Sequence, residues 1–429
     1  MEKDKLEPKL RFPGFTEPWE QRKLASLATM NARIGWQNLR TSEFLDSGDY
    51  LLITGVDFKS GGVDLEHCKF VDERRYEQDK KIQLSEGSIL LTKDGTLGKV
   101  AFIKSLPKPA TLNAGVFNIR VINPEKLSPK FLYIYLSGPF LMDYVAKTST
   151  GGTIQHLNQS VLRDFLVPYP KFEEQEKISS ILDGVNQIIT LHQRKEEELQ
   201  KLKKGLLQKM FPKDGESVPE IRFPNFTDSW EHRKFGELFT FLQNNTLSRA
   251  DLYPKGIAYN VHYGDVLIKY GEVIDLDVDQ AEMIADDVIV KKYLKSKLQN
   301  GDLIFADTAE DETVGKTSEI QNIGNRTVIS GLHTIPLRPK TEFAFGFLGF
   351  LFSSVNFRNE LKPLIQGIKV SSISKNALKT LTVKISADVK EQAEISNLLL
   401  HLSHAITLHH RKTEELKKLK KALLQQMFV

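Results

Sequence analysis

Residues Glu174 to Phe211 read EQEKISSILDGVNQIITLHQRKEEELQKLKKGLLQKMF, and the stretch returns as Glu391 to Phe428, EQAEISNLLLHLSHAITLHHRKTEELKKLKKALLQQMF. The two segments align without a gap, and 23 of their 38 positions are identical. Identity at that level over such a length indicates an internal duplication. The chain of 429 residues is therefore expected to contain two related halves.

The duplicated segment has the seven-residue periodicity of a coiled-coil helix, without proline. The repeating positions are Ile178, Val185, His192, Leu199 and Leu206 in the first copy and Ile395, Leu402, His409, Leu416 and Leu423 in the second. A second row is expected at Ile181, Ile188 and Leu202, and at Leu398, Ala405 and Leu419. Each helix would have about 39 residues and a length of roughly 58 Å. Because so long an amphipathic helix needs a partner, we expect the two copies to pair, with His192 and His409 as polar positions that set their register.

A second marker opens each half. Residues 11–20 read RFPGFTEPWE, residues 222–231 read RFPNFTDSWE, and an Arg-Lys pair follows both. The marker tryptophans, Trp19 and Trp230, are 211 residues apart, whereas Phe211 and Phe428 are 217 apart. The six additional residues of the second half must therefore lie between the markers. A turn-rich connector, residues 212–219, separates the two halves.

Between the markers the pattern changes to short apolar runs divided by glycine turns, from Leu24 to about Pro170 and from Phe235 to about Ser386. One helix is expected late in each domain, at residues 129–145 and 342–361. Short segments correspond loosely: 98–99 with 315–316, 113–115 with 329–331, and 150–158 with 366–374. Near-identical helices that flank divergent domains suggest one scaffold that presents two different recognition domains.

The predicted class is therefore α+β, with two tandem sheet-rich domains and two long helices. The predicted bounds are 1–170 for the first domain, 171–211 for the first helix, 212–220 for the linker, 221–386 for the second domain and 387–429 for the second helix. A chain of this length is also more easily accommodated in two cores than in one.

Bulk composition excludes several classes of protein. The chain is 40% hydrophobic and 27% charged, and no apolar run approaches the roughly 20 residues of a membrane helix. No export signal is recognised and Cys68 is the single cysteine, so we expect a cytoplasmic protein without a disulfide or structural zinc. The net charge of +4 permits nucleic-acid binding without demonstrating it.

Motifs for catalysis are missing from the sequence. There is no Asn/Asp-Pro-Pro-aromatic segment of the kind that adenine methyltransferases carry. Gly315-Lys316-Thr317 resembles the end of a phosphate-binding loop, but the first glycine of that motif is replaced by Glu310. No His/Cys cluster has metal-ligand spacing, and Asp286-Asp287 is interpreted as acidic surface. Catalysis and cofactor binding are therefore expected in other chains.

The entry motifs RFPGF and RFPNF, the segments DGTLGK and GGTI, and the two helices resemble the specificity subunit of type I restriction-modification systems over essentially the whole chain. The resemblance implies a pseudo-two-fold arrangement in which two target-recognition domains each read half of a bipartite double-stranded DNA sequence. It also implies that two antiparallel helices form the spacer. A helix of about 58 Å corresponds to roughly 17 base pairs.

The resemblance further implies partners that do the chemistry. Two methyltransferase subunits would use S-adenosylmethionine, and restriction subunits would use ATP and magnesium. Polar and basic loop residues are the DNA-binding candidates, since such side chains contact phosphates and base edges. In the first domain they are Thr92, Lys93, Lys99, Asn113, Gln155, His156, Asn158 and Gln159, and in the second they are Lys316, Thr317, Arg326, His333, Lys369, Ser371, Ser372 and Lys375.

Two other functions are consistent with parts of the sequence. A fused methyltransferase or nuclease would bind a cofactor by itself, and the missing motifs argue against it. A coiled-coil scaffold that binds only protein would leave the two divergent domains unexplained.

Overall fold

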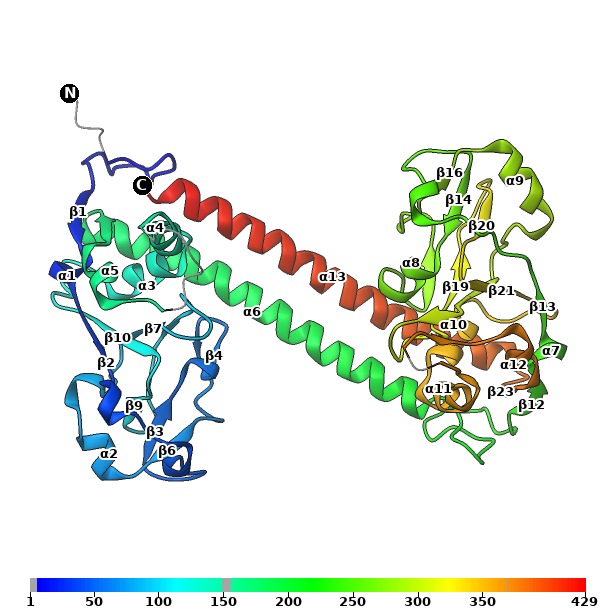
Figure 1. Cartoon of the computed structure of the whole chain (residues 1–429), viewed down its shortest axis with the longest axis horizontal. Helices are drawn as coiled ribbons and strands as arrows, with labels where there is room; N and C mark the ends of the chain where they lie inside the picture. The colour runs from blue at the N-terminus through cyan, green and yellow to red at the C-terminus, as the bar shows by residue number, and fades with distance from the viewer. Residues whose placement is uncertain (1–5, 149–155, 368) are drawn as a thin grey trace. The chain divides into compact units, whose positions relative to one another are not determined.

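A computed structural model describes residues 6–148, 156–367 and 369–429, except for the side chain of Trp36 (Figure 1). The chain forms two compact units. Unit 1 contains Met1–Gln193 and Arg411–Val429, and unit 2 contains Arg194–His410. Each unit therefore holds one sheet-rich domain together with part of both long helices.

In unit 1, the central sheet has four antiparallel strands in the order β2 (Ala28–Ala32), β10 (Val116–Val121), β7 (Ile89–Thr92) and β8 (Val100–Phe102). A second sheet has the order β6 (Lys69–Val71), β3 (Tyr50–Ile53) and β9 (Ala110–Leu112), and two short pairs join β1 (Glu20–Lys23) to β11 (Leu166–Tyr169) and β4 (Phe58–Lys59) to β5 (Gly62–Val63). The helices are α1 (Leu24–Leu27), α2 (Glu73–Glu77), α3 (Pro129–Ser137), α4 (Phe140–Thr148), α5 (Gln159–Asp164) and the long α6 (Phe172–Lys209).

Unit 2 repeats this order with additions. Its central sheet has the order β13 (Phe239–Phe241), β21 (Thr334–Pro339), β17 (Leu303–Ala306), β19 (Thr317–Gln321) and β15 (Val273–Asp275). The second sheet has the order β16 (Met283–Ile284), β14 (Ala258–Val261) and β20 (Val328–Ser330), and the short pairs are β12 (Glu231–Lys234) with β23 (Thr382–Ile385) and β18 (Thr308–Ala309) with β22 (Ser371–Ser372). The helices are α7 (Phe235–Leu238), α8 (Tyr263–Ile268), α9 (Asp287–Tyr293), α10 (Phe347–Ser353), α11 (Val355–Leu361), α12 (Lys375–Thr380) and the long α13 (Val389–Met427).

The two domains differ most after the first strand of the second sheet. In unit 1, β3 is followed by the hairpin of β4 and β5. In unit 2, β14 is followed by α8 and by β15, which pairs parallel to β19 and extends the central sheet. The additional elements thus lie inside the globular domain, and the long helices keep their gapless correspondence.

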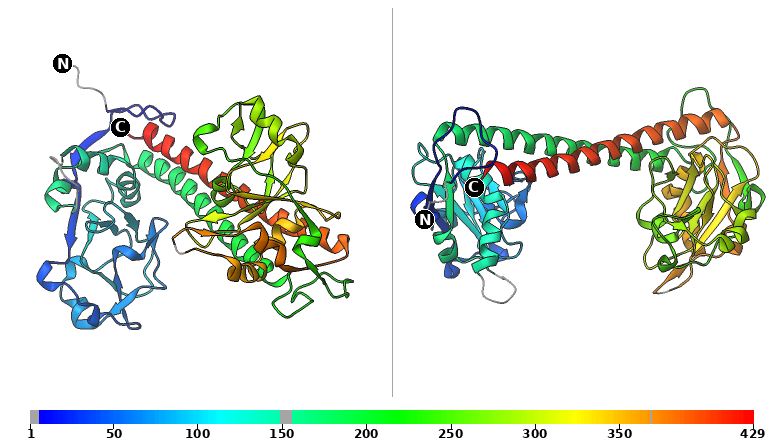
Figure 2. Two further views of the ribbon diagram at one scale, coloured as in Figure 1. Left: turned by 45° about the vertical axis from the view of Figure 1, so that its right-hand side comes forward. Right: turned by 90° about the horizontal axis from the view of Figure 1, so that it is seen from above.

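The two long helices run antiparallel in both units (Figure 2). In unit 1, Ile178 and Leu182 near the start of α6 share a core with Met427 at the end of α13. In unit 2, Ile395 and Leu399 near the start of α13 share a core with Phe211, which follows α6. The predicted α+β class with an antiparallel pair of long helices is confirmed. Among the described helices, none has the length and apolar character needed to cross a membrane.

The residues buried between the two long helices differ in part from the two rows of heptad positions that the sequence predicts. All ten heptad residues predicted for the first row are buried or half-buried. Four of the six residues of the second row are wrong, because Ile181, Ile188, Leu202 and Leu419 are 41%, 45%, 50% and 48% exposed, whereas Leu398 and Ala405 are half-buried. The buried row lies one residue later, at Leu182, Ile189 and Leu399. The pattern was hidden because this row continues through polar residues, Glu196 and Lys203 in α6 and Thr413 and Lys420 in α13.

The end of each long helix closes an aromatic cluster. In unit 1, Trp19 lies edge-on to Phe428 and near Phe131 of α3, with ring centroids 6.0 Å apart in both pairs. In unit 2, Trp230 makes the corresponding contacts with Phe211 at 6.0 Å and with Phe347 of α10 at 5.8 Å. The marker tryptophans therefore lie in the core, where they join the entry of each domain to the end of a long helix.

Candidate functional site

Three segments of the first domain meet beyond the end of β7, and we call this region the unit 1 strand-end junction. The segments are residues 92–99, 113–115 and 156–159. The backbone N–H of Lys93 donates to the carbonyl of Gly115 at 2.8 Å, and that of Leu157 donates to the carbonyl of Lys93 at 2.8 Å. Polar loop residues that are distant in the sequence are thereby brought together at the end of β7, an inner strand of the central sheet.

The corresponding segments meet beyond β17 and form the unit 2 strand-end junction, residues 306–317, 331–333 and 369–375. The N–H of Asp307 donates to the carbonyl of His333 at 3.0 Å, and that of Ile373 donates to the carbonyl of Asp307 at 2.9 Å. These bonds match those of unit 1, so Gly115 corresponds to His333. The expected match of 113–115 with 329–331 is therefore wrong by two residues, because it followed the Ser-Gly and Ala-Gly letters instead of the strand register.

All first-domain candidates that the structure describes lie at the unit 1 junction, and Gln155 lies outside the described residues. Lys99, His156 and Asn158 are exposed. Thr92 is 2% exposed, and its hydroxyl accepts from the N–H of Lys99 at 2.9 Å. The amide of Gln159 donates to the carbonyl of Met30 at 2.6 Å, which fixes the start of α5 to β2.

The other two first-domain candidates are half-buried. The ammonium of Lys93 lies 5.7 Å from the ring centroid of Phe117. The side-chain oxygen of Asn113 is buried and has no hydrogen-bond partner among the described residues. Lys93, Lys99, His156 and Asn158 therefore remain available to an outside ligand, whereas Thr92 and Gln159 hold the junction together.

In the second domain, the structure separates the candidates into three groups. His333, Lys369 and Ser372 are exposed at the unit 2 junction, and Ser371 is half-buried beside them. Lys316, Thr317 and Lys375 are at the junction but are turned inward. Arg326 lies elsewhere, in the loop after β19, where its guanidinium donates to the carbonyl of Ile323 at 3.1 Å.

Lys316 shows why position alone does not make a ligand. Its ammonium donates to the carbonyls of Leu267 and Tyr270, both at 2.9 Å, at the end of α8. Burial lowers the pKa of Lys316. Thr317 is 1% exposed and its hydroxyl donates to the carbonyl of Gly315, while the ammonium of Lys375 donates to the carbonyl of Leu242 at 3.3 Å. These three residues serve the architecture of the junction.

Sequence reasoning missed the carboxylates of the two junctions. Asp94 contacts the ring of His156, with Oδ1 and Nδ1 2.6 Å apart. Asp307 contacts His333 in the same way at 3.3 Å, and Thr308 donates to Asp307 at 2.7 Å. The sequence signal was the position of each aspartate within two residues of the end of β7 or β17.

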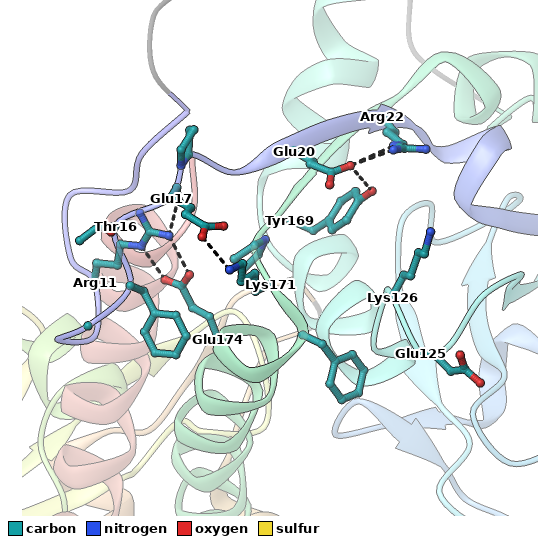
Figure 3. A pocket seen from close by; sticks show the side chains of 15 residues that line it. Arg11, Thr16, Glu17, Glu20, Arg22, Glu125, Lys126, Tyr169, Lys171 and Glu174 are labelled. Carbon is teal, nitrogen blue, oxygen red and sulfur yellow. Dashed lines mark hydrogen bonds and ion pairs between the residues drawn. The ribbon is translucent and has the colours of Figure 1, made fainter.

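A second polar region lies where the first domain meets α6. The guanidinium of Arg11 donates to both carboxylate oxygens of Glu174, at 2.9 and 3.0 Å, and these bonds raise the pKa of Arg11. Figure 3 shows this pair beside a pocket of about 390 Å³, along with the bond from Lys171 to Glu17 at 2.7 Å. Arg222 and Glu391 make the equivalent pair in unit 2, at 2.5 and 2.9 Å. Because both halves repeat it, the pair belongs to the scaffold.

The thiol of Cys68 is 4% exposed, and burial raises its pKa to about 12. A thiol that stays protonated is a poor nucleophile. Within the described residues, no group of three or more His, Cys, Asp or Glu side chains is placed to hold a metal ion. The geometry thus offers two polar junctions suited to contacting an extended ligand.

Comparison with known proteins gives a consistent result. The family model described as type I restriction modification DNA specificity domain matches residues 16–201 and again 227–418. The type I restriction enzyme MjaVIII specificity subunit of Methanocaldococcus jannaschii is 22% identical over 357 residues, which cover 81% of this chain and 79% of the relative. The putative MjaX specificity subunit of the same organism is 22% identical over 97% of this chain and 94% of its own length.

Solved structures share the fold over the whole chain. The S subunit of a type I restriction-modification system from M. genitalium has a TM-score of 0.57 and 15% identity, with 99% of both chains covered. A chain from a structural study of complex assembly in the type I system has a TM-score of 0.50 and 16% identity, with 98% of this chain and 99% of that chain covered.

Proposed function

The chain belongs to the family of type I restriction-modification DNA specificity proteins, and from this premise we propose that its two domains each recognise one half of a bipartite double-stranded DNA target. The two strand-end junctions are the proposed DNA-contacting surfaces. Lys93, Lys99 and Lys369 would contact phosphates, while other exposed polar side chains of the junctions would contact base edges.

One observation carries this proposal: the scaffold is repeated and the junctions are not. The aromatic clusters and the Arg–Glu pairs have the same geometry in both halves. At the junctions, by contrast, Gly115 corresponds to His333 and His156 corresponds to Ser372. A repeated scaffold that carries different polar residues at equivalent positions of its two junctions is suited to binding two different DNA half-sites. The continuous α6 and α13, of 38 and 39 residues, would fix the gap between them.

The direct test is to map methylated adenines in cells that express this chain with its methyltransferase, and in cells that lack this chain. A bipartite methylated motif that depends on the chain is expected. If the motif is absent, or if it is continuous and not bipartite, the proposed function is wrong.

Exchange of one domain tests its modularity. Residues 24–170 are replaced by the equivalent domain of another specificity subunit, and the methylated motif is mapped again. Only one half of the motif should change, since the second domain and its junction are untouched. A change in both halves would contradict independent recognition.

Exposed apolar residues on the long helices support docking of two identical protein partners. Leu191 of α6 and its counterpart Leu408 of α13 are 63% and 62% exposed, and Leu202 and Leu419 are 50% and 48% exposed. Apolar side chains exposed at matched positions in two copies of a helix are suited to two equivalent protein contacts. We therefore propose that each unit docks one methyltransferase subunit, and that restriction subunits join through these.

The docking proposal is tested by co-purification with the methyltransferase. Leu191→Lys or Leu408→Lys should reduce the bound methyltransferase from two copies to one, and the double variant should bind none. DNA binding by the chain alone should be unchanged in all three. Retention of two copies by the double variant would contradict this surface.

The same proposal assigns the chemistry to other chains in the cytoplasm. S-adenosylmethionine would be bound by the methyltransferase, and ATP and magnesium by the restriction subunits. The chain alone should therefore bind DNA with no measurable affinity for S-adenosylmethionine, as checked by calorimetry. Tight binding of S-adenosylmethionine by the chain alone would favour the fused-enzyme alternative.

A further inference from the structure

Each strand-end junction holds an imidazole ring against a carboxylate, although the two rings come from different segments. In unit 1, His156 precedes α5 and contacts Asp94, which is 62 residues away in the sequence. In unit 2, His333 lies between β20 and β21 and contacts Asp307, which is 26 residues away. Asp307 directly follows β17, whereas Asp94 lies two residues after the end of β7.

The backbone of His333 supports a specific role. Its φ of 54° lies in the left-handed region, which residues with a side chain adopt less readily than glycine. The counterpart Gly115 has a φ of 87°, which glycine adopts readily. The side chain that His333 adds at this glycine-like position places its ring against Asp307. That ring also lies edge-on to Tyr263, with centroids 5.2 Å apart, which restricts its orientation.

Unit 1 also places a histidine ring against an aspartate, but the histidine comes from a different segment of the chain. A Cβ atom built on Gly115 would lie 3.6 Å from both Cβ and Oδ2 of Asp94, so a side chain at this position would face the carboxylate as His333 does. Glycine leaves that space open, and His156 supplies the ring from across the junction. Lys93 also faces the carboxylate, with Nζ 4.0 Å from Oδ2.

The hydrogen bond fixes what each ring presents to a ligand. Nδ1 faces the carboxylate in both pairs, so in the neutral ring Nδ1 carries the hydrogen and Nε2 is an acceptor. The side chains of His156 and His333 remain 67% and 46% exposed. In the described part of the chain, no hydrogen bond to Nε2 of either ring is found. An acceptor held in a fixed direction matches an exocyclic amino group, which in the major groove belongs to adenine N6 or cytosine N4.

We propose that His333 and His156 are specificity-determining residues that each accept a hydrogen bond from the amino group of one adenine or cytosine, in the half-site read by their own domain. Asp307 and Asp94 are positioning residues that hold the rings in the accepting tautomer. The inference rests on the proposed function, because it names the base chemistry that the two junctions read.

The experiment measures binding of the full chain to duplexes that contain its mapped target. Each adenine or cytosine of the half-site is replaced in turn by purine or pyrimidin-2-one, which lack the amino group. For the unaltered protein, one position in the half-site of the second domain should weaken binding by about tenfold. For His333→Gly, the same replacement should weaken binding by less than about twofold, because the acceptor is already missing.

His333→Gly is the informative variant because it installs the residue that unit 1 has at the corresponding turn. Glycine adopts the left-handed backbone readily, so the fold should be retained, which the thermal unfolding midpoint checks. His156→Ala gives the reciprocal result in the other half-site. His67→Ala is the matched control, because His67 is also exposed and bonded to an aspartate, Asp64, at 3.0 Å, but lies outside the junction.

The outcomes separate the two proposals. If no bipartite motif is found with the unaltered chain, the proposed function fails first. If the motif is found, but the amino-deleted bases weaken binding of His333→Gly as much as that of the unaltered chain at every position, the histidine proposal fails and the function stands. If His333→Gly affects the half-site of the first domain instead, the proposal is also overturned. Asp307→Asn should reproduce part of the effect, since the ring loses its fixed tautomer.

Discussion

Trp19 packs edge-on against Phe428 with an interplanar angle of 85°, and Trp230 packs against Phe211 at 83°, with the same centroid separation of 6.0 Å. The strand-end junctions of the same two units share their backbone hydrogen bonds and a histidine–aspartate contact, but these side chains come from different positions and the other exposed polar residues differ. The contrast shows which parts of the duplicated chain are alike: the contacts that fix each domain to the helices are repeated, whereas the exposed polar residues of the junctions differ.

The repeated frame nevertheless contains differences in hydrogen bonding. In unit 2, the carboxylate of Glu391 accepts from Arg222, from the indole N–H of Trp230 at 3.2 Å and from Ser386 at 2.5 Å. In unit 1, Glu174 accepts from Arg11, and the buried indole N–H of Trp19 has no partner among the described residues. The contacts between domain and long helix therefore have the same packing in both units but different hydrogen bonds. Substitutions can measure the contributions of the packing and of the hydrogen bonds separately.

The largest effect is expected from the aromatic residues that end the helices. Phe211→Ala and Phe428→Ala should each lower the free energy of unfolding by about 4 kcal/mol, because both side chains are almost fully buried. Denaturant unfolding followed by tryptophan fluorescence measures both variants. Equal losses would confirm that the two aromatic clusters contribute equally to the free energy of unfolding. A loss in only one of the variants would show that the two clusters contribute unequally.

Substitution of the two scaffold carboxylates, Glu391 and Glu174, should lower the free energy of unfolding by different amounts. Glu391→Ala removes the carboxylate that accepts from Arg222, Trp230 and Ser386 and should cost about 3 kcal/mol. Glu174→Ala should cost less, since Arg11 retains a bond to the carbonyl of Glu17. The same unfolding assay compares them. A larger loss for Glu174→Ala would mean that the contacts with Trp230 and Ser386 add nothing.

A pH dependence should distinguish unit 2 from unit 1. Glu319 of β19 is 2% exposed and accepts from the N–H groups of Gly346 and Gly349, at 2.8 and 3.0 Å. Burial raises its pKa to about 7. Since the folded-state pKa lies above the unfolded value, its contribution to stability is present in acid and is lost as the pH rises through 7.

This loss between pH 5 and 8 should be on the order of 2 kcal/mol, and Glu319→Gln should flatten it. Phe102 holds the equivalent position in unit 1, so that unit should lack this component. Unfolding midpoints across the pH range test the prediction. An unchanged profile in Glu319→Gln would assign the dependence to other groups.

The smallest effects are expected at two equivalent lysines of the helix contact, with opposite signs. Lys203 forms an ion pair with Glu272 at 2.7 Å, so Lys203→Met should cost about 1 kcal/mol. Lys420 is half-buried, its pKa is lowered by burial, and it has no ion-pair partner in the described part of the chain. Lys420→Met should therefore stabilise the protein by about 1 kcal/mol. The same sign for both substitutions would contradict the role of Glu272.

The sequence predicted the scaffold better than the surface it carries. The repeated Trp and Phe markers and the heptad positions are local patterns, and they identified the halves, the long helices and their partner. The second heptad row failed because Glu196 and Lys203 interrupt the apolar pattern that the buried row would otherwise show. The contact between Asp94 and His156 joins segments 62 residues apart, and the left-handed backbone of His333 has no local sequence signature. Such features follow from tertiary packing, which no short sequence window contains.

The distribution of residues between the two units has a consequence for synthesis. Unit 2 is one continuous segment, Arg194–His410, whereas unit 1 needs Arg411–Val429 in addition to Met1–Gln193. Phe428, which lies beside Trp19 in unit 1, is therefore synthesised after every residue of unit 2. Loss of residues 411–429 would therefore remove part of unit 1 and leave all residues of unit 2 present. The part of the chain that is made first is thus the last to have all the residues of its core.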